Sequence, residues 1–189
     1  CELVHLGSLY HDDVMDEAEL RRSRPTLATR AGNTTSVLVG DALFAHALRL
    51  AAGFPTTEVC RAVASATKTV CTGEIIQSHR RLGGGTSRAN YLRILRMKTA
   101  ELFALSTEMG SSLSGAASDE RLALREYGMA LGTAYQIYDD CVDLFGSEAT
   151  AGKSLRTDPA NGKATLPIIV TLERANERDR QELERIAEN

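Results

Sequence analysis

Apolar residues recur three and four positions apart along most of the chain, as they do on one face of an α-helix. Leu3, Leu6 and Tyr10 already follow this spacing at the start. Four prolines, nine aromatic residues and no tryptophan accompany the pattern. We therefore predict an all-α protein, with helices from the first residue to about Arg21 and over 33–52, 57–81, 88–114, 119–145 and 167–187.

Glycine, proline and hydroxyl residues separate these predicted helices. Ser23, Pro25 and Thr26 mark a loop after the first helix, with Pro25 as the breaker. Residues 146–166 form a longer loop that carries several basic side chains. The three glycines at 83–85 are interpreted as a flexible turn, because neither a preceding strand nor a following Lys-Ser/Thr pair suits a phosphate-binding loop.

The length and composition suit one globular domain over residues 1–189. The chain is 43% hydrophobic and has a formal net charge of −3, which excludes a disordered tail and a polybasic nucleic-acid binder. Its longest stretch without a charged residue is Tyr127 to Tyr138. That stretch is far shorter than the roughly 20 apolar residues of a membrane-spanning helix.

The four cysteines and the two chain ends indicate the context of this domain. Cys1, Cys60, Cys71 and Cys141 form no Cys-x-x-Cys pair, which favours free thiols in a reducing cytoplasm. The chain begins without a methionine or a secretory signal. Helical spacing starts at once, and the last residues are charged helix formers without a stop signal, so we expect a domain truncated at both ends.

Two copies of the pattern Asp-Asp-x-x-Asp use six of the chain's ten aspartates. They are Asp12-Asp13-Val14-Met15-Asp16 and Asp139-Asp140-Cys141-Val142-Asp143. On a helix, the first and last aspartate of each motif lie on one face, one turn apart. Because aspartate disfavours helices and clustered like charges repel, each motif destabilises its helix unless cations bind to it.

Carboxylate oxygens without histidine or cysteine select hard cations. Mg²⁺ characteristically takes one or two carboxylates and completes its coordination with water and substrate phosphate. The pair of motifs therefore predicts Mg²⁺ and a phosphorylated substrate. A solvated acidic surface is one alternative; a calcium EF-hand is another, but the motifs lack its alternating loop and distal glutamate.

Basic side chains lie close to both motifs along the sequence. Arg21 and Arg22 follow the first motif, and Lys153 and Lys163 follow the second. Lys98 lies in an amphipathic segment, where it either extends from a packed helix or binds a ligand. No nucleophile motif and no metal-ligand spacing of the histidines is present in the sequence.

The chain resembles the head-to-tail trans-isoprenyl diphosphate synthases, or polyprenyl synthetases, of medium- or long-chain type. The resemblance covers essentially the whole chain and rests on residues 5–16, 21–22, 40–41, 73–77, 98–100, 136–140, 152–153 and 162–167. It implies an isoprenoid synthase-type helical bundle around a deep central cavity, with the two aspartate motifs facing each other near its mouth. The family commonly forms homodimers.

The resemblance also implies roles for the acidic and basic residues. Asp12, Asp16 and Asp139 match direct Mg²⁺ ligands, supported by Asp13, Asp140 and Asp143, so that three Mg²⁺ bridge the motifs to an allylic diphosphate. Several basic residues match positions at this diphosphate: Arg21, Lys98, Lys153 and Lys163. Thr99 and Gln136 match residues at the reacting centre, and His5 and Arg22 match residues that bind isopentenyl diphosphate.

The implied reaction is ionisation of the allylic diphosphate, condensation with isopentenyl diphosphate and loss of a proton. Two features depart from the family. Ser154, Arg156 and Pro159 replace the family's Pro, Gly and Leu in the loop that keeps Lys153 and Asp158. The family's upstream Gly-Lys-x-x-Arg motif, which helps to bind isopentenyl diphosphate, would lie before Cys1.

The residues before the first motif predict the product length. In the resembled family, bulky residues four and five positions before this motif stop chain growth, and here these are the small Ser8 and Gly7. The predicted cavity wall continues to Val4 and Cys1 without an aromatic residue, over about 16 Å of helix. We expect a product longer than fifteen carbons, with Phe44 either a floor of the cavity or a core residue.

Three alternatives stay open. A class I terpene cyclase also ionises a diphosphate, but its second metal motif normally reads Asn/Asp-x-x-Ser/Thr-x-x-x-Glu rather than Asp-Asp-x-x-Asp. A non-catalytic partner subunit of a synthase would usually have lost one motif. A helical interaction module would need neither.

Overall fold

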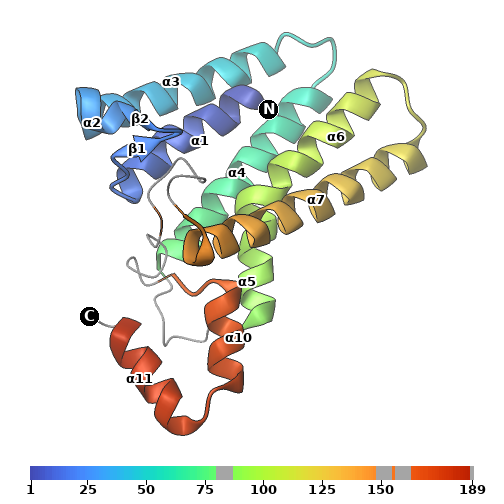
Figure 1. The fold of residues 1–189 in the computed structure, drawn as a ribbon. Helices are drawn as coiled ribbons and strands as arrows, with labels where there is room; N and C mark the ends of the chain where they lie inside the picture. Colours follow the sequence, from blue (N-terminus) through green and yellow to red (C-terminus); the bar gives the residue numbers. More distant parts are fainter. Residues whose placement is uncertain (80–86, 148–154, 156–162, 188–189) are drawn as a thin grey trace.

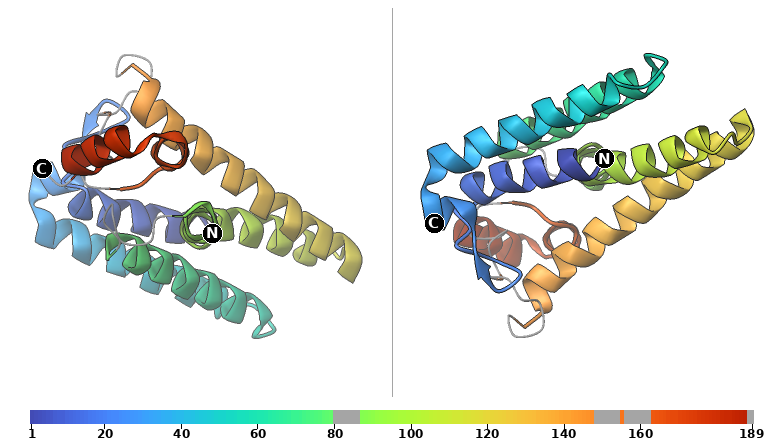
Figure 2. Two further views of the ribbon diagram at one scale, coloured as in Figure 1. Left: turned by 90° about the horizontal axis from the view of Figure 1, so that it is seen from below. Right: turned by 90° about the horizontal axis from the view of Figure 1, so that it is seen from above.

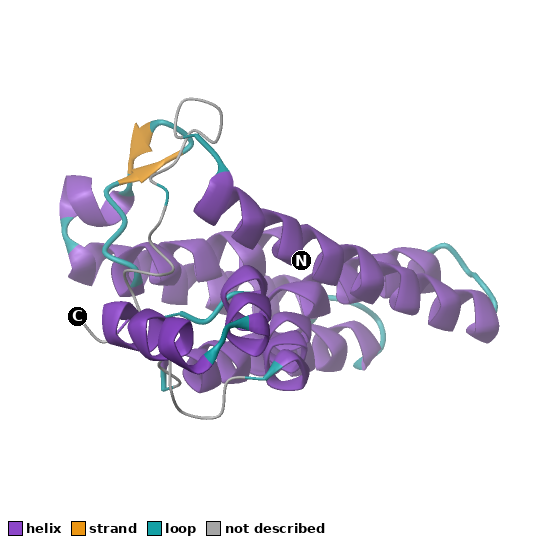
Figure 3. Cartoon of the chain, turned by 60° about the horizontal axis from the view of Figure 1, so that its bottom comes forward, coloured by secondary structure: helices purple, strands orange, loops and turns teal. Residues whose placement is uncertain are grey.

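The computed structural model describes residues 1–79, 87–147, 155 and 163–187. Helices make up nearly all of the described structure, and the described strands form one short hairpin (Figure 3). This confirms the predicted all-α class. In chain order the elements are α1 Glu2–Met15, β1 Leu20–Arg21, β2 Arg24–Pro25, α2 Leu27–Ala31, α3 Asn33–Ala51, α4 Glu58–Ser78, α5 Arg88–Leu95, a π-helical segment Arg96–Ala100, α6 Glu101–Leu113, α7 Ser118–Phe145, α10 Leu166–Arg174 and α11 Glu177–Ala187.

The long helices pack around a core of small and aliphatic side chains. The most extensive contacts join α1 to α3 and α6 to α7, and Figure 2 shows both pairs side by side. Val4 of α1 is fully buried among residues of α3, α4 and α6, namely Ala47, Ala51, Val63, Ala66, Leu105 and Met109. A second cluster joins Tyr91 and Leu95 of α5 to Ile169 of α10 (Figure 1). These two clusters hold the helices that carry the aspartate motifs.

Glycines allow three helical segments to approach closely where the cavity begins. A Cβ atom at Gly73 of α4 would lie 2.8 Å from the backbone nitrogen of Lys98. A Cβ atom at Gly132 of α7 would lie 2.6 Å from the Cα atom of Ala100. Both distances are shorter than packed carbon and nitrogen atoms allow. The π-helical segment is therefore held between α4 and α7, where only glycine fits.

The first helix ends earlier than the sequence suggested. It was predicted to reach about Arg21, but α1 ends at Met15, and Glu17 has a φ of 50°. The backbone N–H of Ala18 then bonds to the carbonyl oxygen of Asp13 at 2.9 Å. The chain continues into the β1–β2 hairpin, whose two turn residues Arg22 and Ser23 also have positive φ. This is the twist of a two-residue hairpin turn, which is normally built from glycine and asparagine.

A helix that the pattern did not predict follows the hairpin. Thr26 caps the N-terminus of α2, its hydroxyl oxygen accepting a hydrogen bond from the Thr29 N–H at 3.2 Å. The same hydroxyl donates to the carbonyl oxygen of Ala18 at 2.8 Å. Thr26 thus ties the hairpin to α2 and fixes the segment just after the first aspartate motif.

Two long predicted helices are interrupted. The helix expected over 88–114 contains the π-helical segment, which separates α5 from α6. The helix expected over 167–187 is two helices, because Ala175 is extended, with a ψ of 143°. Asn176 caps the second of them, accepting a hydrogen bond from the Asp179 N–H at 2.9 Å.

Two further predictions concern the context of the fold. Among the described residues, no helix is long and apolar enough to cross a membrane. Cys1, Cys60, Cys71 and Cys141 are free thiols in this structure.

Candidate active site

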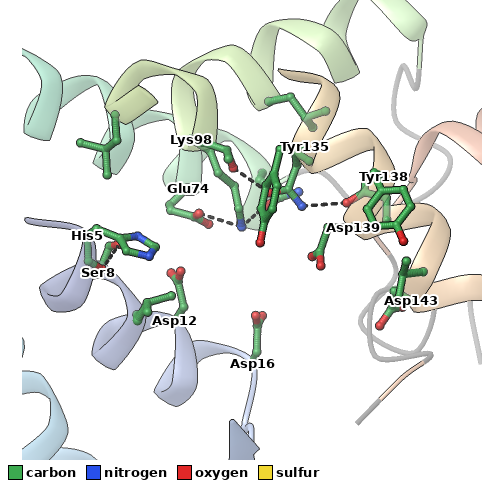
Figure 4. Close-up of a pocket in the computed structure, with 18 of the residues that line it drawn as sticks. His5, Ser8, Asp12, Asp16, Glu74, Lys98, Tyr135, Tyr138, Asp139 and Asp143 are labelled. Carbon is green, nitrogen blue, oxygen red and sulfur yellow. Dashed lines mark hydrogen bonds and ion pairs between the residues drawn. The ribbon is translucent and has the colours of Figure 1, made fainter. Parts of the chain in front are cut away.

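Both aspartate motifs contribute to one cavity of ≈ 1260 Å³. Its walls come from α1, the β1–β2 hairpin, α4, the π-helical segment with α6, and α7. Figure 4 shows Asp12 and Asp16 on one side of an open space, with Asp139 and Asp143 on the other. The fold thus brings together two motifs that lie far apart in the sequence.

The three aspartates of the first motif have different environments. Asp12, in the last turn of α1, and Asp16, at its C-cap, both line the cavity. Asp13 is 3% exposed and is bound by Arg21, whose Nε donates to its Oδ1 at 2.8 Å. Asp13 therefore binds Arg21 of the β1–β2 hairpin and does not line the cavity with Asp12 and Asp16. This bond holds the Arg21 side chain, which itself lines the cavity.

All three aspartates of the second motif line the cavity. Asp140 and Asp143 are nevertheless buried, at 5% and 3% exposure. Both carboxylate oxygens of Asp140 accept hydrogen bonds from side chains, Oδ2 from the Tyr91 hydroxyl at 2.6 Å and Oδ1 from Gln136 Nε2 at 2.9 Å. Asp140 is thus part of the scaffold behind Asp139.

Lys98 extends into the cavity from the π-helical segment. Its Nζ is 2.7 Å from Glu74 Oε1 and donates to Gln77 Oε1 at 2.9 Å, both residues coming from α4. Burial lowers the pKa of Lys98, but the carboxylates of Glu74 and Asp12 more than offset this, so the pKa is raised above its ordinary value. The ammonium group is therefore a permanent positive charge beside the first motif.

Asp12 lies where carboxylates are crowded and partly dehydrated. Burial is the main cause that raises the pKa of Asp12 to about 6, and the neighbouring Glu74 and Asp16 raise it further. Lys98 and Arg21 oppose the shift without cancelling it. The free protein thus holds its acidic motif at an energetic cost that a bound cation would relieve.

A chain of hydrogen bonds runs behind the cavity wall. The Thr99 hydroxyl donates to Gln136 Oε1 at 2.7 Å, and Gln136 is in turn bound to Asp140. Burial and the adjacent Asp140 raise the pKa of Tyr91 far above its ordinary value, so its hydroxyl keeps its proton. Thr99 and Gln136, both lining the cavity, are thereby fixed in orientation.

The other predicted basic residues that the structure describes lie at the same cavity. Lys163 Nζ is 2.8 Å from Asp16 Oδ1. His5 and Arg22 line the cavity with Arg21. Lys153 lies outside the described residues, as do Ser154, Arg156, Asp158 and Pro159 of the predicted loop.

Part of the predicted chain-length wall, Cys1 and Ser8, lines the cavity, and the rest lies in the core. Ser8 lines the cavity, but Val4 is a core residue, and a Cβ atom at Gly7 would meet the Phe44 ring at 3.0 Å. Val4, Gly7 and Phe44 therefore lie in the packing between α1 and α3, behind the cavity. The helix presents a neighbouring face to it, which includes Cys1, Ser8 and Leu9. The opposite wall carries Phe103 and Tyr135, whose ring centroids are 5.7 Å apart.

The sequence did not single out two residues that bind predicted site residues, Glu74 at Lys98 and Tyr91 at Asp140. Glu74 lies in the segment 73–77, one of those on which the family resemblance rests. Its pairing with Lys98 depends on the close packing of α4 against the π-helical segment. Tyr91 has the spacing of a core aromatic residue, which it also is. A polar end on a buried aromatic residue is the signal that points to a specific partner such as Asp140.

Among the residues that the structure describes, no three acidic, histidine or cysteine side chains are gathered closely enough to hold a metal ion by themselves. Each motif instead offers a pair of carboxylates to the same open space.

Solved structures share this arrangement of helices. A crystal structure of a decaprenyl diphosphate synthase from Rhodobacter capsulatus matches with a TM-score of 0.90 at 39% identity, covering 98% of this chain and 57% of that one. A polyprenyl synthase from Caulobacter crescentus, solved with calcium and isoprenyl diphosphate, matches with a TM-score of 0.87 at 34% identity, covering 98% and 62%. The chain therefore has the all-helical isoprenoid synthase fold.

The sequence comparisons place the chain more narrowly. The model of the polyprenyl synthetase family matches residues 1–189. An octaprenyl diphosphate synthase from Haemophilus influenzae is 37% identical over 175 residues, which are 93% of this chain and 53% of that protein. The chain belongs to the polyprenyl synthetase family. It spans about half the length of the curated relatives that it matches.

Proposed function

We propose that this chain carries the active site of a Mg²⁺-dependent trans-prenyltransferase. The reaction joins isopentenyl diphosphate head-to-tail to an allylic diphosphate and gives a polyprenyl diphosphate longer than fifteen carbons. One observation carries the proposal. Asp12 with Asp16 and Asp139 with Asp143 face each other across a single cavity that also holds Lys98 and Lys163.

The donor set suits Mg²⁺. Mg²⁺ prefers hard oxygen ligands, and it takes one or two carboxylates from a protein when phosphate oxygens complete its coordination. In this structure an ammonium group already occupies part of the site, because Lys163 is 2.8 Å from Asp16. Asp12, Asp16 and Asp139 would hold the ions, three per site as the family resemblance implies. Bound Mg²⁺ supplies Lewis-acid stabilisation of the leaving diphosphate.

The basic residues would divide between the two substrates. Lys98 and Arg21, held by Glu74 and Asp13 respectively, are fixed donors at the allylic diphosphate. Lys163 would exchange its bond with Asp16 for a phosphate oxygen, and Lys153 would act from the same side. His5 and Arg22 would bind isopentenyl diphosphate. Preorganised positive charge of this kind favours departure of the diphosphate without a nucleophile from the protein.

The cavity lining supports a long product. Ser8 is small and lies on the wall of α1, and Leu102, Phe103 and Val70 give an apolar surface across from it. An apolar chain displaces water from such a surface at about 25 cal/mol per Å². The names of the octaprenyl and decaprenyl relatives point in the same direction.

The test combines substrate binding with turnover. The 189-residue chain is incubated with farnesyl diphosphate, isopentenyl diphosphate and Mg²⁺, and the products are identified by mass spectrometry after removal of phosphate. Calorimetry measures farnesyl diphosphate binding with and without Mg²⁺. We expect Mg²⁺-dependent binding and products beyond fifteen carbons. Asp12→Asn and Asp139→Asn should abolish both, whereas Asp119→Asn, exposed at the start of the same α7, should abolish neither.

Each alternative gives a different result. Cyclic or farnesol-type products would indicate a class I terpene cyclase. Mg²⁺-dependent binding without condensation would favour a non-catalytic subunit of a synthase if a longer chain that includes the family's upstream Gly-Lys-x-x-Arg motif also failed to condense the substrates. Condensation that survives Asp12→Asn would overturn the proposed site.

We further propose that the protein is a homodimer of the reducing cytoplasm. One side of α3 exposes Val37, Leu38 and Leu48, with Leu38 at 61%. Exposed aliphatic side chains on one helix are typical of an association surface. Sedimentation analysis should give twice the chain mass, and Leu38→Glu should shift the protein toward the monomer; a monomeric wild type would refute this.

A further inference from the structure

Tyr91 is joined to the catalytic wall by a short, buried hydrogen bond. Its ring lies in the cluster with Leu95 and Ile169, and the whole residue is 7% exposed. Its hydroxyl donates to Asp140 Oδ2 at 2.6 Å, and Asp140 itself is 5% exposed. A charge-assisted hydrogen bond in such a dry setting has a strong effect on geometry.

The bonds beyond Asp140 have a fixed direction. A carboxylate only accepts, so Gln136 must turn its Nε2 toward Asp140 Oδ1, at 2.9 Å. The amide oxygen of Gln136 then faces Thr99. Because that oxygen also only accepts, the Thr99 hydroxyl must donate its hydrogen to it, at 2.7 Å. The proton of Thr99 is therefore directed away from any ligand in the cavity.

We propose that Tyr91 is a positioning residue that, through Asp140 and Gln136, makes Thr99 Oγ1 present a lone pair rather than a hydrogen to the reacting carbon. The catalytic consequence rests on the function proposed above. A lone pair stabilises the positive charge that develops when an allylic diphosphate departs, whereas a hydroxyl hydrogen would oppose it. The Asp140 carboxylate sets the direction of these hydrogen bonds, and Tyr91, which lies outside the aspartate motifs, holds that carboxylate in place.

Tyr91→Phe tests this role because it removes only the hydroxyl and keeps the ring in its cluster. We expect the condensation rate to fall about 10- to 100-fold, as when a supporting hydrogen bond behind a ligand is lost. The dissociation constant of farnesyl diphosphate with Mg²⁺ should stay within about twofold, because no contact with the diphosphate changes. Tyr127→Phe is the matched control, since Tyr127 is 58% exposed on α7 and makes the same chemical change away from the cavity.

A second variant separates positioning from general damage. If Tyr91 acts through the amide, Tyr91→Phe should cause no further loss of rate in a Gln136→Leu background. Circular dichroism checks that this background is folded. An equal loss in both backgrounds would overturn the proposal, because Tyr91 would then act by another route.

Nuclear magnetic resonance gives a readout that does not depend on turnover. The side-chain amide signals of Gln136 should shift and exchange faster with water in Tyr91→Phe than in the wild type. If the wild-type chain shows no condensation, the proposed function fails while this measurement still decides the geometry. Unchanged Gln136 signals would overturn the positioning role, whatever the rate.

Discussion

The close approach of α7 to the π-helical segment at Gly132 makes a sharp prediction about stability. In Gly132→Ala the new Cβ atom would lie 2.6 Å from Ala100 Cα and 2.8 Å from the Phe103 ring. Ordinary contacts between carbon atoms are about 3.5–4.0 Å, so α7 must move by about 1 Å. Overpacking of this kind costs about 1–3 kcal/mol, and the better helix propensity of alanine returns about 1 kcal/mol.

We therefore expect Gly132→Ala to lower the free energy of unfolding by up to about 2 kcal/mol in urea denaturation. The same substitution at Gly110 of α6 is the control, because a Cβ atom there meets nothing within 4 Å. Gly110→Ala should raise stability by up to about 1 kcal/mol, a gain of about 2–4 °C in Tm for a chain of this size. Equal stabilisation by both substitutions would refute the close approach of α7 to the π-helical segment.

Three further outcomes are expected. Asn176→Ala removes the cap of α11 and should cost that helix about 1 kcal/mol, seen as faster amide hydrogen exchange there. Ser8→Phe should shorten the product, because Ser8 lines the cavity. Phe44→Leu should alter stability but leave the product length unchanged, because Phe44 packs against the core. Mass spectrometry measures the product lengths, and a change caused by both substitutions or by neither would contradict the assignment of Ser8 to the cavity wall. The pKa of Asp12 is raised to about 6, so the folded state binds more protons than the unfolded state between about pH 4 and 6, and stability without metal should fall as the pH rises through that range. Asp12→Asn should remove this fall and raise neutral-pH stability by up to ~3 kcal/mol, measured by urea denaturation in chelator; an unchanged pH profile would contradict the shift.

Periodic patterns predicted the long helices because burial on one face determines them. The helices over 33–52, 57–81 and 119–145 agree with α3, α4 and α7 within a few residues. The early end of α1 was not predictable from periodicity, because the apolar and polar positions continue to Arg21. It depends instead on positive φ values and on Thr26, which bonds to Ala18 across the hairpin.

The candidate site, like the fold, was predictable from the sequence only in part. The two motifs identify the candidate metal-binding carboxylates, because clustered aspartates destabilise a helix and the structure of the helix alone does not require them. Helical spacing predicts that the first and last aspartate of each motif share a face. The partners of the middle aspartates come from other elements and were not predictable: Arg21 engages Asp13, and Tyr91 engages Asp140. Val4 and Gly7 of the predicted wall pack on α3 for a similar reason. The packing of α1 on α3 decides the rotation of the helix, and no pattern within α1 alone records it.

Electrostatics connects the stability of this chain to its proposed chemistry. Burial and neighbouring carboxylates raise the pKa of Asp12, so its charged form is unfavourable in the free protein. Lys98, which is paired with Glu74 beside Asp12, offsets this shift only in part, and Lys163 lies 2.8 Å from Asp16. Divalent cations with a diphosphate would bring both signs of charge to the same space, satisfying carboxylates and ammonium groups together. The ionised form of Asp12, which is unfavourable in the free protein, would thus be favoured in the state that the proposed reaction requires.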